Sequence, residues 1–282
     1  MSPLLTAAVH AQWSAALRNG VRVVECSLDL QRSQTSVVLE PDAWIWEGRR
    51  FPYLPACKDR TIYYWTGEAF LPAARFRGAL IKLVPTQWGA PTFEIDGVKM
   101  LPTARISPYA DAQLKVGFVR PQGKVVLDTC GGLGYFAAWC LQGQASQVIS
   151  YEKSADVLWL RTLNPWSPAA GARLRLIEGD ITLQIASLAD GSVDAILHDP
   201  PRFRLAGELY SQVFYDSLAR VLKDRGTLFH YTGSPNKLTS GRDVGNEVAE
   251  RLRRAGFDAE IKGDGVLATR HAAGSRRPRP TA

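Results

Sequence analysis

The sequence contains little that would build a disulfide scaffold, a metal site or a membrane span. Only four of the 282 residues are cysteine, and they form no Cys-x-x-Cys pair or other metal-ligand spacing. No apolar run approaches the roughly 20 residues that span a bilayer. The first arginine is Arg18, so the sequence does not show the basic segment followed by an apolar stretch that is typical of a signal peptide. We therefore expect a soluble, unexported protein of the reducing cytoplasm that holds no metal and does not bind membranes.

The C-terminal end has no acidic residue, and its arginines supply much of the net charge. The chain carries a formal charge of +7, and four arginines within residues 270–282 contribute four of these charges. The first 269 residues are therefore only mildly basic, at +3. A basic surface attracts nucleic acid because binding releases counterions from the phosphates. We predict a disordered basic tail over residues 271–282, which leaves an RNA-binding module as an alternative function without arguing for it.

The first hundred residues are predicted to form a helix and a small antiparallel domain. The whole chain has 46% hydrophobic and 22% charged residues, a composition that excludes an intrinsically disordered or fibrous protein. Residues 4–19 place apolar side chains at helical spacing and end at Asn19-Gly20, a typical helix stop. Residues 21–96 hold short β-branched and aromatic segments between Pro, Gly and Asp. We expect a β-rich domain over 1–100 and a connector, including one helix, over 101–122.

Residues 123–270 alternate apolar strands with helices. The expected helices are 136–142, 155–163, 182–188, 208–222 and 243–255, and the expected strands are KVVLD, QVISYE, RLRLIEGD, VDAILHD, GTLFHYT, DAEIK and VLATR. Strands that are apolar on both faces and alternate with helices indicate a doubly wound parallel sheet. Gly263-Asp264-Gly265 favours a hairpin between the last two strands. The predicted fold class is α/β, with a doubly wound, mostly parallel seven-stranded sheet and a small β-rich N-terminal domain.

A glycine-rich turn after the first of these strands is the most informative segment. Residues 125–136 read as a buried strand that ends in Asp128, turns through three glycines and opens a helix. Such turns bind ligands at the carboxyl ends of strands in open α/β sheets. Dinucleotides and S-adenosylmethionine both use this geometry. The pattern G-x-G-x-x-A and Glu152 suit a dinucleotide, but an acid beside a pyrophosphate is unfavourable, so Asp128 favours the positively charged methyl donor.

The segment resembles the first motif of the class I S-adenosylmethionine-dependent methyltransferases. The resemblance implies that Asp128, Cys130, Gly132 and Gly134 surround the methionine part of the cofactor. Cys130 departs from the family, which usually has glycine there. Acids that end the next two strands have roles as well: the resemblance implies that Glu152 holds the ribose hydroxyls, and that Asp180 accepts from the adenine amino group with Ile181 against the ring. Singly, each acid has a plainer interpretation as a helix cap or a solvated charge.

The fourth strand ends in His198-Asp199-Pro200-Pro201. This matches the D/N-P-P motif of superfamily members that methylate amino nitrogens, in which the acid and the carbonyl before the second proline accept the amine's hydrogens. The resemblance assigns Asp199, Pro200 and Pro201 to catalysis. His198 is predicted to be catalytic as well, because a histidine near its ordinary pKa could remove the proton from an amine. Arg202, Phe203 and Tyr231 are assigned to the acceptor; Arg202 stands where the motif usually has an aromatic, which leaves room for an anionic acceptor.

Five segments together resemble a family of uncharacterised prokaryotic methyltransferases with a DPPRF motif: KLVPTQWGAPT from Lys82, LDTCGGLGYFA from Leu127, HDPPRF from His198, AGELYS from Ala206 and LFHY from Leu228. The stretch that begins GELYSQVFYDSL at Gly207 is similar to spermidine synthases, so aminopropyl transfer is an alternative, although the paired acids of their fourth-strand motif are not matched. A nicotinamide-dependent oxidoreductase is a third alternative. His198 and His230 with Asp199 have the composition of an iron site, but adjacent strand-end histidines more often form hydrogen bonds within a pocket. A general-base role for either histidine is a secondary interpretation. Tyr109 and Asp111 are equally suited to cover the ligand or to serve as a packed loop aromatic and a helix cap, respectively.

The class of methyl acceptor, whether small molecule, RNA or protein, and the oligomeric state stay open.

Overall fold

A computed structural model describes residues 2–203, 206–233, 243–272 and 274 of the chain, which divide into two compact units. The first unit comprises Met1–Asp111 together with Asp156–Ser167, and the second comprises Ala112–Ala155 together with Pro168–Ala282. The domain boundaries expected from the sequence stay a prediction, and most of the basic tail at 271–282 lies outside the described residues. Within the described ranges, no helix is long and apolar enough to cross a lipid bilayer.

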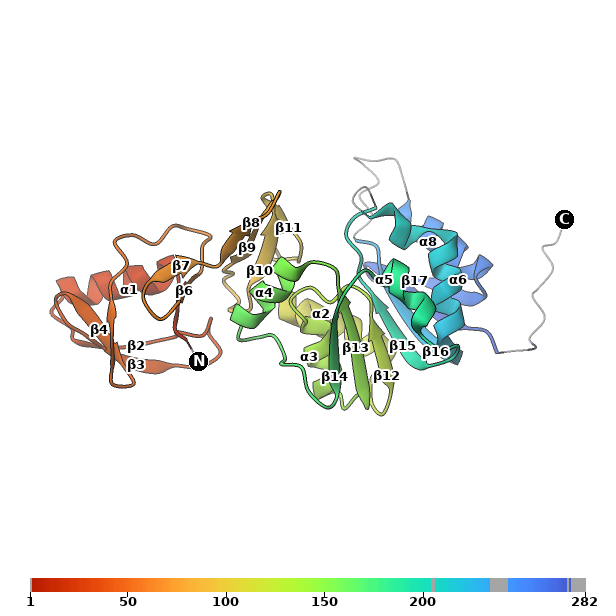
Figure 1. Ribbon diagram of the computed structural model, residues 1–282, viewed down its shortest axis with the longest axis horizontal. Coiled ribbons are helices and arrows are strands. Elements are labelled where there is room, and N and C mark those ends of the chain that lie inside the picture. Colours follow the sequence, from red (N-terminus) through yellow and green to blue (C-terminus); the bar gives the residue numbers. More distant parts are fainter. Residues whose placement is uncertain (1, 204–205, 234–242, 273, 275–282) are drawn as a thin grey trace. The chain divides into compact units, whose positions relative to one another are not determined.

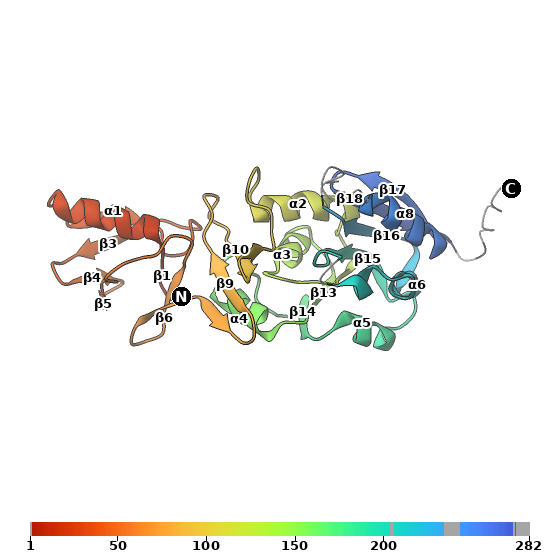
Figure 2. The ribbon, with the colours of Figure 1, turned by 90° about the horizontal axis from the view of Figure 1, so that it is seen from above.

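The first unit holds three small antiparallel sheets, the helix α1 and, from Asp156 on, the helix α4 (Ala155–Leu163) (Figures 1 and 2). The sheets have the orders β1-β6-β7, β2-β3-β4-β5 and β11-β10-β9-β8. The elements are β1 (Leu4–Leu5), α1 (Ala7–Arg18), β2 (Val23–Cys26), β3 (Thr35–Leu39), β4 (Ala43–Trp46), β5 (Arg49–Pro52), β6 (Tyr63–Trp65), β7 (Phe70–Pro72), β8 (Ala74–Phe76), β9 (Leu80–Val84), β10 (Thr92–Ile95) and β11 (Val98–Lys99). Aromatic side chains pack around Trp44, which is fully buried and stacks on Phe51 with ring centres 4.5 Å apart.

The helix predicted over residues 4–19 is shorter than expected. Thr6 has an extended backbone and caps the helix by accepting a hydrogen bond from the amide of Val9, so α1 begins at Ala7. Leu4 and Leu5 instead form β1 and pair with Tyr64 and Tyr63 of β6. Their apolar side chains matched the helical period, but they are buried as a strand.

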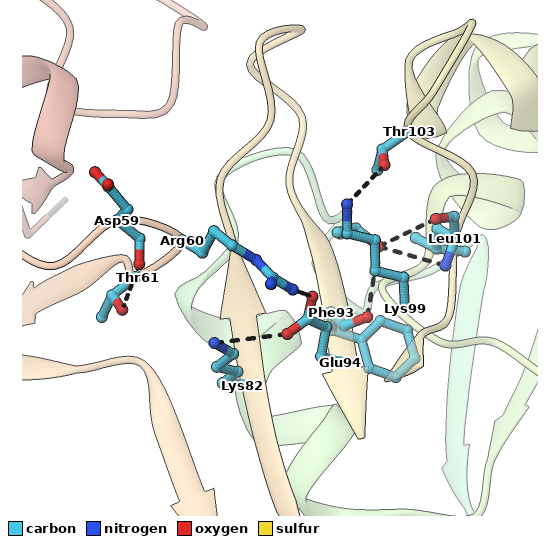
Figure 3. Close-up of polar contacts among 10 residues, drawn as sticks. Asp59, Arg60, Thr61, Lys82, Phe93, Glu94, Lys99, Leu101 and Thr103 are labelled. Carbon is cyan, nitrogen blue, oxygen red and sulfur yellow. Dashed lines mark hydrogen bonds and ion pairs between the residues drawn. The ribbon is translucent and has the colours of Figure 1, made fainter. Parts of the chain in front are cut away.

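A buried carboxylate organises the sheet of β8 to β11 (Figure 3). Glu94 of β10 is almost fully buried and forms ion pairs with Arg60, which precedes β6, and with Lys82 of β9, whose Nζ lies 3.5 Å away. Removing either partner from such a pair leaves a poorly compensated buried charge. Glu94 therefore connects the segment before β6 to this sheet.

The second unit is built on a seven-stranded sheet of order β14-β13-β12-β15-β16-β18-β17 (Figure 1). All neighbours are parallel except β18, which is antiparallel to β16 and β17. Its strands are β12 (Val125–Asp128), β13 (Gln147–Glu152), β14 (Leu174–Glu178), β15 (Val193–His198), β16 (Leu222–Tyr231), β17 (Phe257–Lys262) and β18 (Gly265–Arg270). This confirms the predicted fold class, including the final hairpin.

Helices cover both faces of this sheet. Leu228 of β16 packs in one core with residues of α6 and α8, whereas the next residue, Phe229, stacks on Phe118 of α2 at 4.8 Å. Because successive strand residues point to opposite faces, α2 lies opposite α6 and α8. The helices of the second unit are α2 (Pro108–Val119), whose first four residues belong to the first unit, α3 (Tyr135–Gln142), α5 (Ile181–Gln184), η1 (Ile185–Ser187), η2 (Gly207–Tyr210), α6 (Gln212–Val221) and α8 (Val244–Arg254).

Two of the predicted helices are divided. The helix expected over 182–188 consists of α5 followed by the 3-10 turn η1. The helix expected over 208–222 is interrupted at Ser211, which has an extended backbone and caps α6 through a hydrogen bond from the amide of Phe214. The preceding residues form the 3-10 turn η2.

Candidate active site

The loop after β12 lies at the carboxyl edge of the parallel strands and leads into α3. Gly134 is the N-cap of α3 with a φ of +81°, and Gly132 has a φ of +48°. A side chain in this left-handed conformation costs about 1–2 kcal/mol, so the turn favours glycine. The amide of Gly131 donates to the carbonyl of Tyr151 at 2.6 Å, which fixes the loop to β13. The predicted turn from strand to helix is therefore present.

Asp128 and Cys130 lie at the start of this loop. Asp128 is fully buried and accepts a hydrogen bond at Oδ2 from the hydroxyl of Ser150 on β13, at 2.8 Å. Burial raises the pKa of the Cys130 thiol well above its ordinary value, so this side chain is a neutral thiol. Cys130 therefore adds no negative charge beside Asp128.

Glu152, at the end of β13, connects the strand to the glycine loop. Its Oε2 accepts from the amide of Gly132 and its Oε1 accepts from the amide of Ser154, both at 2.8 Å. Hydrogen bonds to a carboxylate are stronger than those between neutral groups. The structure thus brings together two residues that the sequence assigned to the same cofactor, 20 positions apart.

Asp180 caps α5, which was the plainer of its two interpretations. Its Oδ1 accepts from the amide and the hydroxyl of Thr182, at 2.9 and 2.6 Å, and its Oδ2 lies 2.7 Å from Nζ of Lys153. Partial burial opposes ionisation of Asp180, but these hydrogen bonds and the nearby lysine outweigh it and lower the carboxyl pKa. Ile181 is buried in the core of the unit. A contact of either residue with a ligand stays a prediction.

The Asp199-Pro200-Pro201 segment follows β15, the strand next to β12. Asp199 lies two residues beyond Leu197, which pairs with Asp128, so both acids lie at the same sheet edge. Oδ2 of Asp199 lies 3.4 Å from Nζ of Lys115, a buried lysine of α2. The carbonyl of Pro201 accepts from the hydroxyl of Tyr210 at 3.1 Å.

The residues assigned to the acceptor have different surroundings. Tyr231 lies against Nζ of Lys115, which is 3.4 Å from the ring centre. Phe203 is half-buried, with its ring 5.4 Å from that of Tyr210. Arg202 is exposed. Tyr109 packs in the first unit with its ring edge-to-face on Trp166, 5.0 Å away.

Both candidate histidines are fully buried and hydrogen-bonded through both ring nitrogens. Nδ1 of His198 lies 2.7 Å from the hydroxyl of Thr129, and Nε2 lies 3.0 Å from the carbonyl of Leu209. Nε2 of His230 lies 3.0 Å from the hydroxyl of Tyr215, and Nδ1 lies 2.9 Å from the carbonyl of Tyr231. These contacts leave neither ring a free nitrogen for a substrate in this conformation.

Burial also keeps both histidines neutral. It lowers the pKa of His198 to about 4 and that of His230 well below its ordinary value. In the part of the chain that the structure describes, no group of three or more His, Cys, Asp and Glu side chains is placed to hold a metal ion. The iron site considered from the sequence is therefore not assembled there.

Comparisons with known proteins agree with this geometry. Residues 145–262 match the family described as S-adenosyl-L-methionine-dependent methyltransferase. The uncharacterized protein MJ1233 of Methanocaldococcus jannaschii is 44% identical over 198 residues, which cover 70% of this chain and 68% of that protein. The chain belongs to the S-adenosyl-L-methionine-dependent methyltransferases. S-adenosylmethionine is its cofactor, so the family decides against the nicotinamide alternative.

Solved structures of low identity share the fold of this methyltransferase. Spermidine synthase from Thermotoga maritima has a TM-score of 0.53 at 15% identity, and the match covers 73% of this chain and 77% of that one. MnmC2 from Aquifex aeolicus has a TM-score of 0.51 at 20% identity, with 68% and 71% covered. The distant similarity to spermidine synthases expected from the sequence is therefore confirmed at the level of fold.

Several residues of the site in the methyltransferase were not identified from the sequence. Lys115, Thr129, Ser150 and Tyr210 each contact a predicted site residue. Thr129 directly follows β12, and Ser150 lies in β13 two residues before Glu152. Both strands were predicted, so the positions of these two residues could have identified them as site residues. Lys115 had no such signal, because it lies in the connector helix, 84 residues before Asp199.

Proposed function

We propose that this methyltransferase transfers a methyl group to a nitrogen atom held by Asp199-Pro200-Pro201. The supporting observation is the position of this segment. It follows β15, the strand beside β12, and is tied to the glycine loop because the hydroxyl of Thr129 lies 2.7 Å from Nδ1 of His198. The amide of Thr129 also donates to the carbonyl of Leu197 at 3.1 Å. An acceptor bound at Asp199 is thereby held beside the loop that holds the donor.

The donor side fits a cofactor that is cationic and carries no phosphate. Residues 128–135 include the buried acid Asp128 and no lysine or arginine, which suits an ammonium and a sulfonium. In this proposal Asp128, Cys130, Gly132 and Gly134 surround the methionine part. Glu152 holds the ribose hydroxyls, and Asp180 and Ile181 bind the adenine. S-adenosylmethionine supplies a methyl group on positively charged sulfur.

The acceptor side acts by orientation. The carboxylate of Asp199 and the carbonyl of Pro200 accept hydrogens from the nitrogen and direct its lone pair at the methyl carbon. A proline donates no amide hydrogen and has a fixed φ, so the two prolines hold these acceptors without internal competition. His198 positions the segment through Thr129 and the carbonyl of Leu209. Arg202, Phe203 and Tyr231 contact the rest of the acceptor, and we place the reaction in the cytoplasm.

A labelling experiment tests the proposal. The protein is incubated with S-adenosylmethionine labelled in the methyl group and with nucleic-acid, protein and small-molecule fractions of a cell extract. Mass spectrometry then locates the label. We expect label on nitrogen and release of S-adenosylhomocysteine. Label on oxygen or carbon, or in no fraction, contradicts the proposal. A parallel incubation uses decarboxylated S-adenosylmethionine; gain of an aminopropyl group by an acceptor, with release of methylthioadenosine, establishes the alternative reaction.

The role of Asp199 is tested by substitution. Asp199→Ala should bind S-adenosylhomocysteine with near wild-type affinity in calorimetry and lose at least about a hundredfold in turnover, since positioned acid–base and orienting groups contribute about that much. Asp190→Asn is the matched control, because Asp190 is an aspartate of the same unit whose side chain is 79% exposed. Turnover by Asp199→Ala that equals the control contradicts this role.

A further inference from the structure

Lys115 places a buried positive charge at the acceptor end of the site. Its side chain is 6% exposed, and that of its partner Asp199 is 19% exposed. Its Nζ lies 3.4 Å from Oδ2 of Asp199 and 3.4 Å from the centre of the Tyr231 ring. The centre of the Phe136 ring lies 5.8 Å from the same nitrogen, and Phe136 follows the glycine loop at the start of α3. Aromatic faces attract cations, and a buried ammonium needs such partners.

This charge affects any nitrogen that binds to Asp199. A nitrogen that donates to the carboxylate lies roughly 3 Å from it, and therefore on the order of 6 Å from Nζ. At that distance, and at an effective dielectric constant near 20, a like charge shifts the pKa of a group by on the order of 1–2 units. The lysine thus disfavours an ammonium at the position where a neutral amine is needed for attack.

We propose that Lys115 is a positioning residue that keeps Asp199 ionised and disfavours a protonated acceptor, so that the site selects nitrogens that are neutral when bound and discriminates against polycations. This inference rests on the proposed function. In the transfer, the lone pair of the neutral nitrogen forms the bond to the methyl carbon, while the bond from that carbon to sulfur breaks and its electrons stay on sulfur. The proton then lost from nitrogen passes to Asp199 or to water.

Other titratable groups face the pair from three elements. Cys130 of the glycine loop and Tyr210 of η2 interact electrostatically with Asp199, and Tyr231 of β16 contacts Lys115. Burial raises the pKa of both Cys130 and Tyr210, so these two are neutral at ordinary pH. On its own helix, Asp111 precedes Lys115 by four residues.

The test uses the acceptor fraction labelled by the wild-type protein. Its methylation is followed at saturating donor from pH 5.5 to 9.5 in the wild type, Lys115→Met, Lys115→Gln and Lys115→Arg. The acidic limb of kcat reports groups in the complex, whereas that of kcat/KM reports the free enzyme and substrate. Met and Gln remove the charge, Gln keeps a hydrogen-bond donor to Asp199, and Arg keeps the charge. Calorimetry with S-adenosylhomocysteine verifies folding.

We expect the acidic limb of kcat to move up by about one pH unit or more in the Met and Gln variants. Their turnover at pH 6 should fall about tenfold or more, approach wild type near pH 9, and be retained by Arg. An equal loss at all pH values indicates a merely structural role and overturns the inference, as does an unmoved limb. If neither neutral variant folds, the wild-type protein provides the test. The pKa read from the acidic limb of its kcat profile must then lie below the pKa of the free acceptor amine, measured by NMR titration. A limb at or above that pKa overturns the inference. Absence of any labelled acceptor contradicts the proposed function instead.

Discussion

Removal of the Glu152 carboxylate should weaken cofactor binding even before any contact with the ribose is considered. The side chain accepts from the amides of Gly132 and Ser154 at 2.8 Å, and the first of these bonds belongs to the glycine loop. A hydrogen bond to a charged group contributes about 1.5–3 kcal/mol, and 1.4 kcal/mol corresponds to a tenfold change in affinity. Glu152→Ala should therefore bind S-adenosylhomocysteine about 10- to 100-fold more weakly, and more if the ribose hydroxyls are also held.

Calorimetric titration measures this change directly. Glu178→Ala is the matched control, because Glu178 pairs in register with Glu152 on the neighbouring strand and is exposed. It should bind S-adenosylhomocysteine like wild type. Thermal unfolding of both variants shows whether the second unit is intact. A folded Glu152→Ala that binds within about threefold of wild type would refute the argument that this carboxylate organises the loop.

Two further predictions concern the loop and the buried histidines. Gly134→Ala places a side chain at a φ of +81° and should reduce the free energy of unfolding by about 1–2 kcal/mol in urea titrations, together with weaker S-adenosylhomocysteine binding; unchanged stability contradicts the left-handed turn. Burial lowers the pKa of His198 to about 4, so between pH 6.5 and 4 the unfolded chain binds a proton that the folded chain does not. As the pH falls from 6.5 to 4, the free energy of unfolding should therefore decrease by up to about 3 kcal/mol because of His198. This free energy should depend less steeply on pH in His198→Gln, and equal slopes in the two proteins contradict the assigned neutral state of His198.

The strand-end residues could be predicted from the sequence because the pattern that marks strands also fixes their last residues. Asp128, Glu152 and Asp199 each follow a short apolar run, and parallel strands bring their carboxyl ends to one edge. The fold class followed from the same alternation. The antiparallel insertion of β18 between β16 and β17 is consistent with the expected hairpin, although its place in the strand order was not predicted.

Contacts between distant segments could not be predicted in this way. Lys115 and Asp199 are 84 positions apart, and nothing in the period of α2 distinguishes a lysine that is buried from one that is exposed. Leu4 and Leu5 satisfied a helical pattern but pair with β6, because an apolar pair is compatible with either period. The hydrogen bonds of His198 likewise depend on Thr129 and Leu209, which only the fold brings together.

The position of the transferred methyl group tests the proposed reaction most directly. With methyl-labelled S-adenosylmethionine and the acceptor fraction, mass spectrometry should locate the label on nitrogen in the wild type and in Asp190→Asn, and should find almost none with Asp199→Ala. Label on another atom, or full labelling by folded Asp199→Ala, would contradict nitrogen methylation at Asp199-Pro200-Pro201.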